Sequence, residues 1–128
     1  LISGPNTGGK TVAMKTVALL ALMAQSALPV PAAEAVLPVF DQVLADIGDS
    51  QSIESSLSSF SSHMSHVAEL LEAATPESLV ILDEIGRSTD PEEGGALGVA
   101  IVDRFHRDGC FTVASTHLLA LKIYGVNH

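Results

Sequence analysis

The sequence predicts an α/β fold in which a mainly parallel sheet is flanked by helices. Apolar stretches of strand length alternate with longer stretches of helical periodicity, an order typical of parallel strands joined by helices. The run Leu79–Leu82 is apolar at four consecutive positions, which indicates a strand buried on both faces. A glycine-rich stretch separates the first predicted strand from the first predicted helix. The helices are expected on the faces of the sheet, joined to it by right-handed connections.

The glycine-rich stretch fits the pattern of a phosphate-binding loop, which is glycine, any four residues, glycine, lysine and then serine or threonine. Its residues are Gly4, Pro5, Asn6, Thr7, Gly8, Gly9, Lys10 and Thr11. Glycines let the backbone fold tightly enough to direct several N–H groups at one phosphate. Lys10 would add a cation for the β- and γ-phosphates, and the Thr11 hydroxyl would be a ligand for Mg²⁺.

The flanks of the loop favour this interpretation over a glycine-rich turn that happens to contain a lysine. Leu1–Ser3 is predicted to end an apolar strand, and Thr11–Leu28 is predicted to be a helix that Pro29 and Pro31 end. This order turns the positive N-terminal end of the helix toward the phosphates. Because the helix is apolar on most faces, we expect it to be buried between the sheet and other elements.

The next part of the chain contains a strand and a serine-rich stretch. Phe40–Ile47 alternates partly between apolar and polar residues and is predicted to be a strand. The composition of residues 50–65 is that of a flexible linker, but their apolar residues recur at spacings of three and four, which favours an ordered, functional segment. A helix is predicted from near Ser61 to Ala74, and Pro76 follows it.

Two carboxylates follow the buried strand Leu79–Leu82 directly. Ligands of open α/β sheets bind at the carboxyl ends of the strands, so Asp83 is placed to hold Mg²⁺. Glu84 can orient the water that attacks a γ-phosphate, because a carboxylate accepts a hydrogen bond from that water. Two solvated acids at a strand end would be the simpler interpretation, but the presence of Lys10 and Thr11 favours the site.

The remaining elements continue the alternation. Asp90 can cap a helix that begins at Pro91, and residues 106–109 close that helix. Cys110–Ser115 is predicted to be another buried strand, and Leu118–Tyr124 is predicted to begin one more helix.

Composition restricts the function classes. The 15 acidic residues against 6 basic ones give a net charge of −9, so this segment is a poor candidate for gripping a DNA backbone. Cys110 is the only cysteine, which leaves no disulfide framework and no thiolate metal site. No signal peptide is evident, and the apolar run Val12–Leu28 is too short and too interrupted to span a bilayer comfortably, so we expect no membrane partner and a cytoplasmic location.

Three motifs in combination resemble the MutS family of ATPases. They are the phosphate-binding loop, residues 82–89 (Leu-Asp-Glu-Ile-Gly-Arg-Ser-Thr) and residues 115–117 (Ser-Thr-His). Details within residues 61–64 and 90–94 are more similar to the bacterial branch that suppresses recombination than to the branch that reads mismatches. The resemblance implies a P-loop NTPase of the ABC-ATPase type. Residues 1–128 would be one segment of the ATPase domain, incomplete at both ends, in agreement with the abrupt start and end of the chain.

The resemblance also assigns roles around the bound nucleotide. Residues 4–11 would form the phosphate loop, with Thr11 and Asp83 at the Mg²⁺ ion. Glu84 and Lys10 would be catalytic, and His117 would sense the γ-phosphate. ATP and Mg²⁺ are therefore the expected substrate and cofactor.

The segment around Ser58 and Ser59 would act in trans in such an enzyme. Their hydroxyls and a helix N-terminus would face the nucleotide of a second subunit, so the active form would be a homodimer with two shared sites. The mismatch-reading branch has a glutamate where this chain has His63, which leaves the pairing of that position open. His63 and His66 are spaced for a shared metal, but solvated or packed side chains are the favoured interpretation.

The function implied by the resemblance is ATP binding and hydrolysis, coupled to DNA binding in repair or in suppression of recombination, with the DNA contacts in other parts of a longer chain. The alternative is a passive nucleotide-binding or dimerisation module that does not turn over by itself. An ATPase subunit of a membrane transporter is disfavoured, because no Leu-Ser-Gly-Gly-Gln-type signature precedes Leu79.

Overall fold

The computed structural model describes residues 1–4, 8–47, 56–87 and 89–128, with positions 56–59 described for their backbone. Within these residues the chain forms a four-stranded sheet with every neighbouring pair parallel, in the order β1-β4-β3-β2. The strands are β1 (Ile2–Ser3), β2 (Val43–Asp46), β3 (Leu79–Leu82) and β4 (Phe111–Thr116). The predicted α/β class with a parallel sheet flanked by helices is confirmed.

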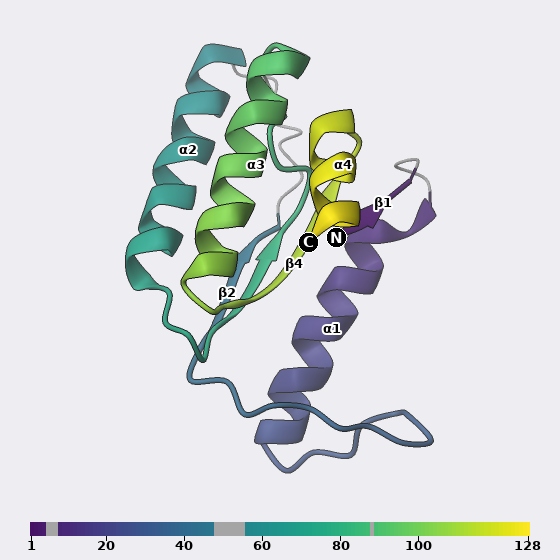
Figure 1. The fold of residues 1–128 in the computed structure, drawn as a ribbon. Helices are drawn as coiled ribbons and strands as arrows, with labels where there is room; N and C mark the ends of the chain where they lie inside the picture. The colour runs from purple at the N-terminus through teal and green to yellow at the C-terminus, as the bar shows by residue number, and fades with distance from the viewer. Residues whose placement is uncertain (5–7, 48–55, 88) are drawn as a thin grey trace.

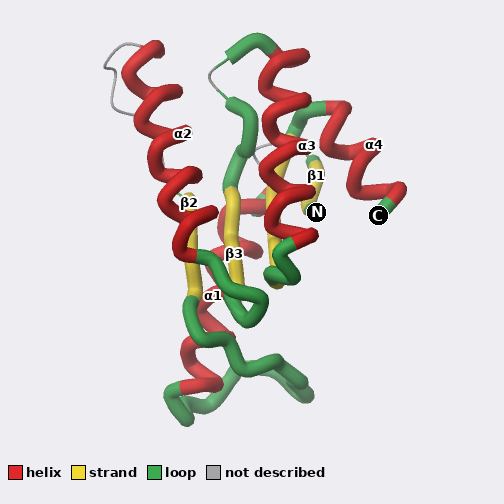
Figure 2. The backbone as a smooth tube through the Cα atoms, turned by 60° about the vertical axis from the view of Figure 1, so that its left-hand side comes forward, coloured by secondary structure: helices red, strands yellow, loops and turns green. Residues whose placement is uncertain are grey.

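Helices cover both faces of this sheet (Figures 1 and 2). They are α1 (Lys10–Gln25), α2 (Ser56–Ala73), α3 (Pro91–Arg107) and α4 (Leu119–Asn127). The central strand β3 divides the core by alternation, because successive side chains point to opposite faces. Leu79 and Ile81 pack with α1, whereas Val80 and Leu82 pack with the cluster formed by α2, α3 and α4. The molecule is therefore a three-layer arrangement with α1 alone on one face.

Helix α1 differs from its prediction in length and in burial. It ends at Gln25 and not at Leu28, because Ala27 adopts a left-handed conformation (φ 57°) and the Leu28 N–H donates to the Met23 carbonyl at 2.9 Å. The helix is also not buried on most faces. Its inner face is buried at Met14, Ala18 and Ala21, but apolar side chains of the outer face are exposed, for example Val12 (67%) and Leu19 (57%).

Two hydrogen bonds between Gln25 and Phe40, here called the clamp, join the ends of the connection from α1 to the sheet. The Gln25 side chain donates to the Phe40 carbonyl at 2.8 Å and accepts from the Phe40 N–H at 2.9 Å. Phe40 itself is buried and packs edge-on against Phe111. Strand β2 begins only at Val43, so the predicted strand Phe40–Ile47 was too long at both ends.

Helix α2 begins at Ser56, five residues before the predicted start near Ser61. The part of the serine-rich stretch from residue 56 to residue 65 is therefore helical, and the linker interpretation is wrong there. The rest of that stretch lies outside the described residues. Val67 and Leu70 give α2 its buried side, which packs in the same cluster as α3 and α4.

Helix α3 begins as the sequence predicts. The Asp90 carboxylate caps it by accepting from the Glu92 N–H at 2.9 Å, and Pro91 occupies the first turn. The turn that precedes the helix lies directly against it, since a Cβ added at Gly94 would lie 2.2 Å from the Gly86 carbonyl oxygen. Gly86 has φ 82°, so this contact depends on glycine at both positions.

Among the described residues, no helix is both long enough and apolar enough to cross a bilayer.

Candidate functional site

The register of the sheet places several of the predicted site residues together at the carboxyl ends of the strands. Leu82 pairs with Ala114, so the next residues, Asp83 and Ser115, are neighbours at the carboxyl ends of β3 and β4. Ser3 pairs with Thr116 in the same way, which puts Gly4 beside His117. The carboxyl ends of parallel strands are where open α/β sheets bind ligands.

The described part of the glycine-rich loop has the backbone of a sharp strand-to-helix turn. Gly9 is the N-cap of α1 with φ 75°, a conformation that disfavours any side chain. A Cβ at Gly4 or Gly9 would meet no atom of the described residues within 4 Å. Lys10 is only 6% exposed, and its Nζ donates to the Gly4 carbonyl at 2.8 Å across the loop. Pro5, Asn6 and Thr7 lie outside the described residues, as does Ser88.

Thr11 and Asp83 meet across the interface between α1 and β3. The Thr11 hydroxyl donates to Asp83 Oδ2 at 2.6 Å, and the Asp83 N–H donates to the Asp46 carbonyl at 2.9 Å. Asp83 is buried. Because the hydroxyl proton of Thr11 is directed at Asp83, the lone pairs of its oxygen remain available to a cation. Hydroxyl and carboxylate oxygens are the ligands that Mg²⁺ prefers, so the donor set fits this ion.

Ser115 connects the two acids, and the sequence analysis did not assign it a role. Its fully buried hydroxyl donates to Asp83 Oδ1 at 2.5 Å and accepts from the Glu84 N–H at 2.9 Å. Its carbonyl accepts from the Ile85 N–H at 3.2 Å. Two signals point to it: the Ser-Thr-His motif contains it, and strand register places Ser115, the residue of β4 that follows Ala114, beside Asp83.

Glu84 has an unusual backbone for its residue type. Its φ is 51°, in the left-handed region that non-glycine residues rarely adopt and that typically costs about 1–3 kcal/mol. The half-buried carboxylate lies 3.9 Å from the Arg87 guanidinium, which is attached to the same turn. The turn thus directs Glu84 away from the course of β3 while leaving its carboxylate accessible.

Two further groups of predicted residues remain, His117 and the pair Ser58 and Ser59. His117 is exposed at the end of β4. Ser58 and Ser59 belong to the first turn of α2, and their side chains lie outside the described residues. Strand β2, which leads toward α2, and strand β1, which leads to the loop, are at opposite edges of the sheet. Three strand spacings of about 4.8 Å separate them by roughly 14 Å.

His63 anchors α2 to the end of β2. Its Nδ1 lies 3.1 Å from Asp46 Oδ2, and the His63 side chain is 7% exposed. Its Nε2 is buried and has no hydrogen-bond partner among the described residues. His66, one turn further along α2, is more exposed and lies 3.8 Å from Glu69. No group of three metal-ligating His, Cys, Asp or Glu side chains occurs in the described ranges.

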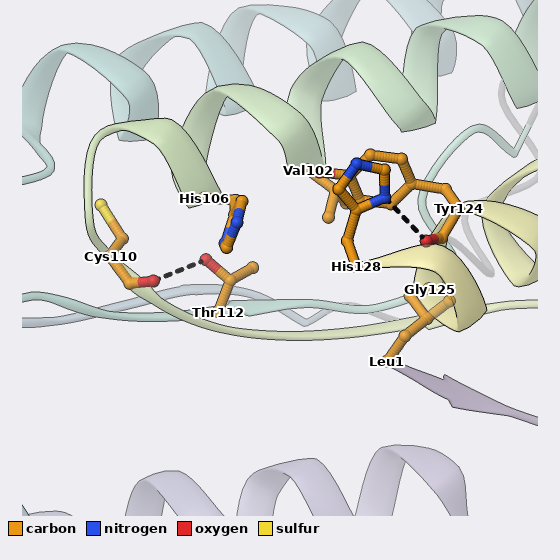
Figure 3. Close-up of a pocket in the computed structure, with 8 residues that line it drawn as sticks. All are labelled: Leu1, Val102, His106, Cys110, Thr112, Tyr124, Gly125 and His128. Atoms are coloured by element: carbon orange, nitrogen blue, oxygen red, sulfur yellow. Dashed lines mark hydrogen bonds between the residues drawn. The ribbon is translucent and has the colours of Figure 1, made fainter.

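A separate cavity of about 250 Å³ lies between α3, α4 and the first half of β4 (Figure 3). Its lining residues are Leu1, Val102, His106, Cys110, Thr112, Tyr124, Gly125 and His128. Tyr124 and His128 stack at 4.4 Å, and burial together with the Asp108 charge raises the pKa of the Cys110 thiol. None of the predicted site residues whose side chains the structure describes lines this cavity.

Comparison with known proteins identifies the family. The family model described as MutS domain V matches residues 1–126. The chain is 55% identical to proteins named Endonuclease MutS2 from Listeria innocua and Listeria monocytogenes, and 56% identical to the one from Geobacillus kaustophilus. Each match covers 99% of this chain and 16% of the relative, so the chain spans about one sixth of the length of these relatives. The match over almost every residue, together with the resemblance of its motifs, shows that the chain belongs to the MutS family.

Proposed function

We propose that this chain is the nucleotide-binding part of a MutS-type ATPase with a P-loop NTPase fold of the ABC-ATPase type. The observation that carries the proposal is the 2.6 Å hydrogen bond from Thr11 to Asp83. It joins Thr11, the last residue of the phosphate-loop motif, to Asp83, the acid that follows the buried strand β3, as Mg²⁺-nucleotide binding requires. Family membership supports the same function.

The residues around the loop would bind the phosphates. No described residue occupies the space beside Gly4 and Gly9, which suits a ligand close to the backbone, and the N-terminal end of α1 favours an anion. Lys10 is already held within the loop by the Gly4 carbonyl, so its ammonium is positioned to exchange this partner for phosphate oxygens. Mg²⁺, when bound, would neutralise charge on the phosphates, with Thr11 and Asp83 as its protein ligands or water-mediated partners.

Hydrolysis would use the residues at the end of β3 and β4. Glu84 would accept a hydrogen bond from the attacking water and orient it, since its carboxylate is partly exposed beside a buried Asp83. His117, exposed at the end of the neighbouring strand, would respond to the γ-phosphate. These two roles follow the family resemblance and the shared edge of the sheet.

Ser58 and Ser59 would serve the nucleotide of a second subunit. The sheet order supports this, because the strand that leads toward α2 is at the edge opposite the strand that leads to the loop. The functional form would then be a homodimer with two shared sites. The relatives are named as endonucleases, and DNA binding by the longer protein would use parts beyond this acidic segment.

The test is ATP binding and turnover by the full-length protein and its Glu84→Gln variant. We expect the variant to bind ATP as the original protein does but to lose most of its turnover. Glu77→Gln is the matched control, because Glu77 is an exposed acid that precedes β3 at the other end of the sheet. Lys10→Ala should lose binding. Unchanged turnover in Glu84→Gln would remove Glu84 as the water-orienting group, and binding without any turnover in the original protein would favour the passive module.

A further inference from the structure

Ser115 holds the two acids of the candidate site in one hydrogen-bonded unit. Its hydroxyl is fully buried, and each of its two hydrogen bonds goes to a different acidic residue. The proton is donated to Asp83 Oδ1, while Asp83 Oδ2 accepts from Thr11. Both carboxylate oxygens of Asp83 are therefore engaged, one from α1 and one from β4.

The same hydroxyl also determines the backbone of Glu84. A serine hydroxyl has one proton. Because Ser115 donates this proton in its hydrogen bond to Asp83, its oxygen can only accept from the Glu84 N–H. Without the Ser115 hydroxyl, the Glu84 N–H would lose this acceptor at a residue whose backbone is left-handed, with a φ of 51°. Strained backbones persist where surrounding contacts over-determine them, and here the contacts come from Ser115. The Ser115 carbonyl adds a third contact to the next residue, Ile85.

We propose that Ser115 is a positioning residue for ATP hydrolysis, which sets the orientation of Asp83 and Glu84 together without touching the substrate. The inference rests on the proposed ATPase function. It deepens that function by making the end of β4 part of the catalytic geometry, two residues before His117. A contribution to packing alone would not distinguish Ser115 from Ser78, the other buried serine among the described residues.

Ser78 provides a matched control for this distinction. It is also fully buried, and its hydroxyl makes hydrogen bonds to Asp41, Thr75 and Gln42. It precedes β3 at the end of the sheet opposite the candidate site. Replacing either serine by alanine removes a buried hydroxyl with several partners, but only Ser115→Ala removes contacts to Asp83 and Glu84.

The first measurement is amide hydrogen exchange of the full-length protein without metal or nucleotide. In the original protein the Glu84 N–H should exchange slowly although it lies outside regular secondary structure, because Ser115 accepts it. In Ser115→Ala its exchange should become fast, while Ser78→Ala should leave it slow. Fast exchange of this amide in the original protein overturns the proposal, and this arm requires no variant to fold.

The second measurement is steady-state ATP hydrolysis by the same proteins. Removing a residue that orients a metal-site carboxylate typically costs about 10- to 100-fold in activity. We expect kcat of Ser115→Ala to fall by this factor with KM for ATP changed much less, and Ser78→Ala to keep its kcat. A kcat in Ser115→Ala equal to that of Ser78→Ala overturns the proposal. Absence of turnover in the original protein would instead count against the ATPase function, and the exchange experiment would still test the contact between Ser115 and Glu84.

Discussion

Gly94→Ala tests whether the close contact between α3 and the turn after Glu84 matters for function. A Cβ at Gly94 would lie 2.2 Å from the Gly86 carbonyl oxygen. Carbon–oxygen contacts normally lie at about 3.3 Å or more, so the two segments would have to separate by about 1 Å. The Gly86 oxygen is a backbone atom and a Cβ is fixed to its own backbone, so neither can rotate away as the end of a long side chain could.

The energetic effect is the difference between two opposing terms. Overpacking of this kind costs about 1–3 kcal/mol, and alanine in place of glycine favours the helix by about 0.5–1 kcal/mol. We expect a net loss of stability of roughly 1–2 kcal/mol. The effect on turnover should be larger, because a displacement of about 1 Å at a catalytic group can cost on the order of 100-fold in rate.

The assay compares thermal unfolding and ATP turnover of Gly94→Ala and Gly95→Ala in the full-length protein. Gly95 is the adjacent residue of the same helix, and among the described residues a Cβ there would meet just the Ala120 Cβ, at 3.1 Å. Both variants gain the same helix propensity, so their difference reports the contact with Gly86. Equal unfolding temperature and turnover of Gly94→Ala and Gly95→Ala would show that neither stability nor catalysis depends on the contact with Gly86.

Two further predictions concern Thr11 and Cys110. Thr11→Val removes the hydroxyl that donates to Asp83 and should weaken Mg²⁺-dependent ATP binding by about 10- to 100-fold, whereas Thr11→Ser should retain it. ATP titrations with Mg²⁺ and with EDTA would measure this, and an unaltered Mg²⁺ dependence in Thr11→Val would exclude Thr11 from the metal site. Burial, with the Asp108 charge as a smaller cause, raises the pKa of the Cys110 thiol, and the thiol also donates to the Thr75 carbonyl. Because the thiolate is the form that reacts, alkylation of Cys110 at about pH 8 should be slow until the protein is denatured. The folded protein favours the neutral thiol, so the contribution of Cys110 to stability is fully present below the pKa of the unfolded protein and is lost as pH rises through the pKa of the folded protein. Equally fast alkylation of native and denatured protein would contradict a raised pKa.

The sequence predicted those parts of the fold that local patterns specify. Strand β3 was predicted with its observed ends, because four apolar residues followed by two acids mark both its burial and its boundary. Thr11 and Asp83 were both assigned to the Mg²⁺ site from motifs, and the structure brings them within hydrogen-bond distance. Ser115 belongs to the Ser-Thr-His motif, but the motif alone gave it no role, because only strand register places its hydroxyl beside Asp83.

The errors in the helices also have physical causes. The prolines after α1 suggested a late end, but Ala27 terminates the helix in a conformation for which alanine has no preference. The apolar residues around α1 suggested burial on most faces, yet only one face meets the sheet. The start of α2 was placed too late because serine is a weak helix former, whereas packing of Val67 and Leu70 stabilises the helix as a whole.

The clamp between Gln25 and Phe40 makes the connection from residue 26 to residue 39 a natural place for a reporter. Two hydrogen bonds hold the ends of this connection together, and Val36 within it is 89% exposed. Because doubling a loop's length adds only about 0.6 kcal/mol of closure cost, a short tag or a fluorophore at this position should leave the fold intact. Because the 16 residues of α1 span about 24 Å, this connection begins about that far from the phosphate loop, so a label there would be remote from the nucleotide site.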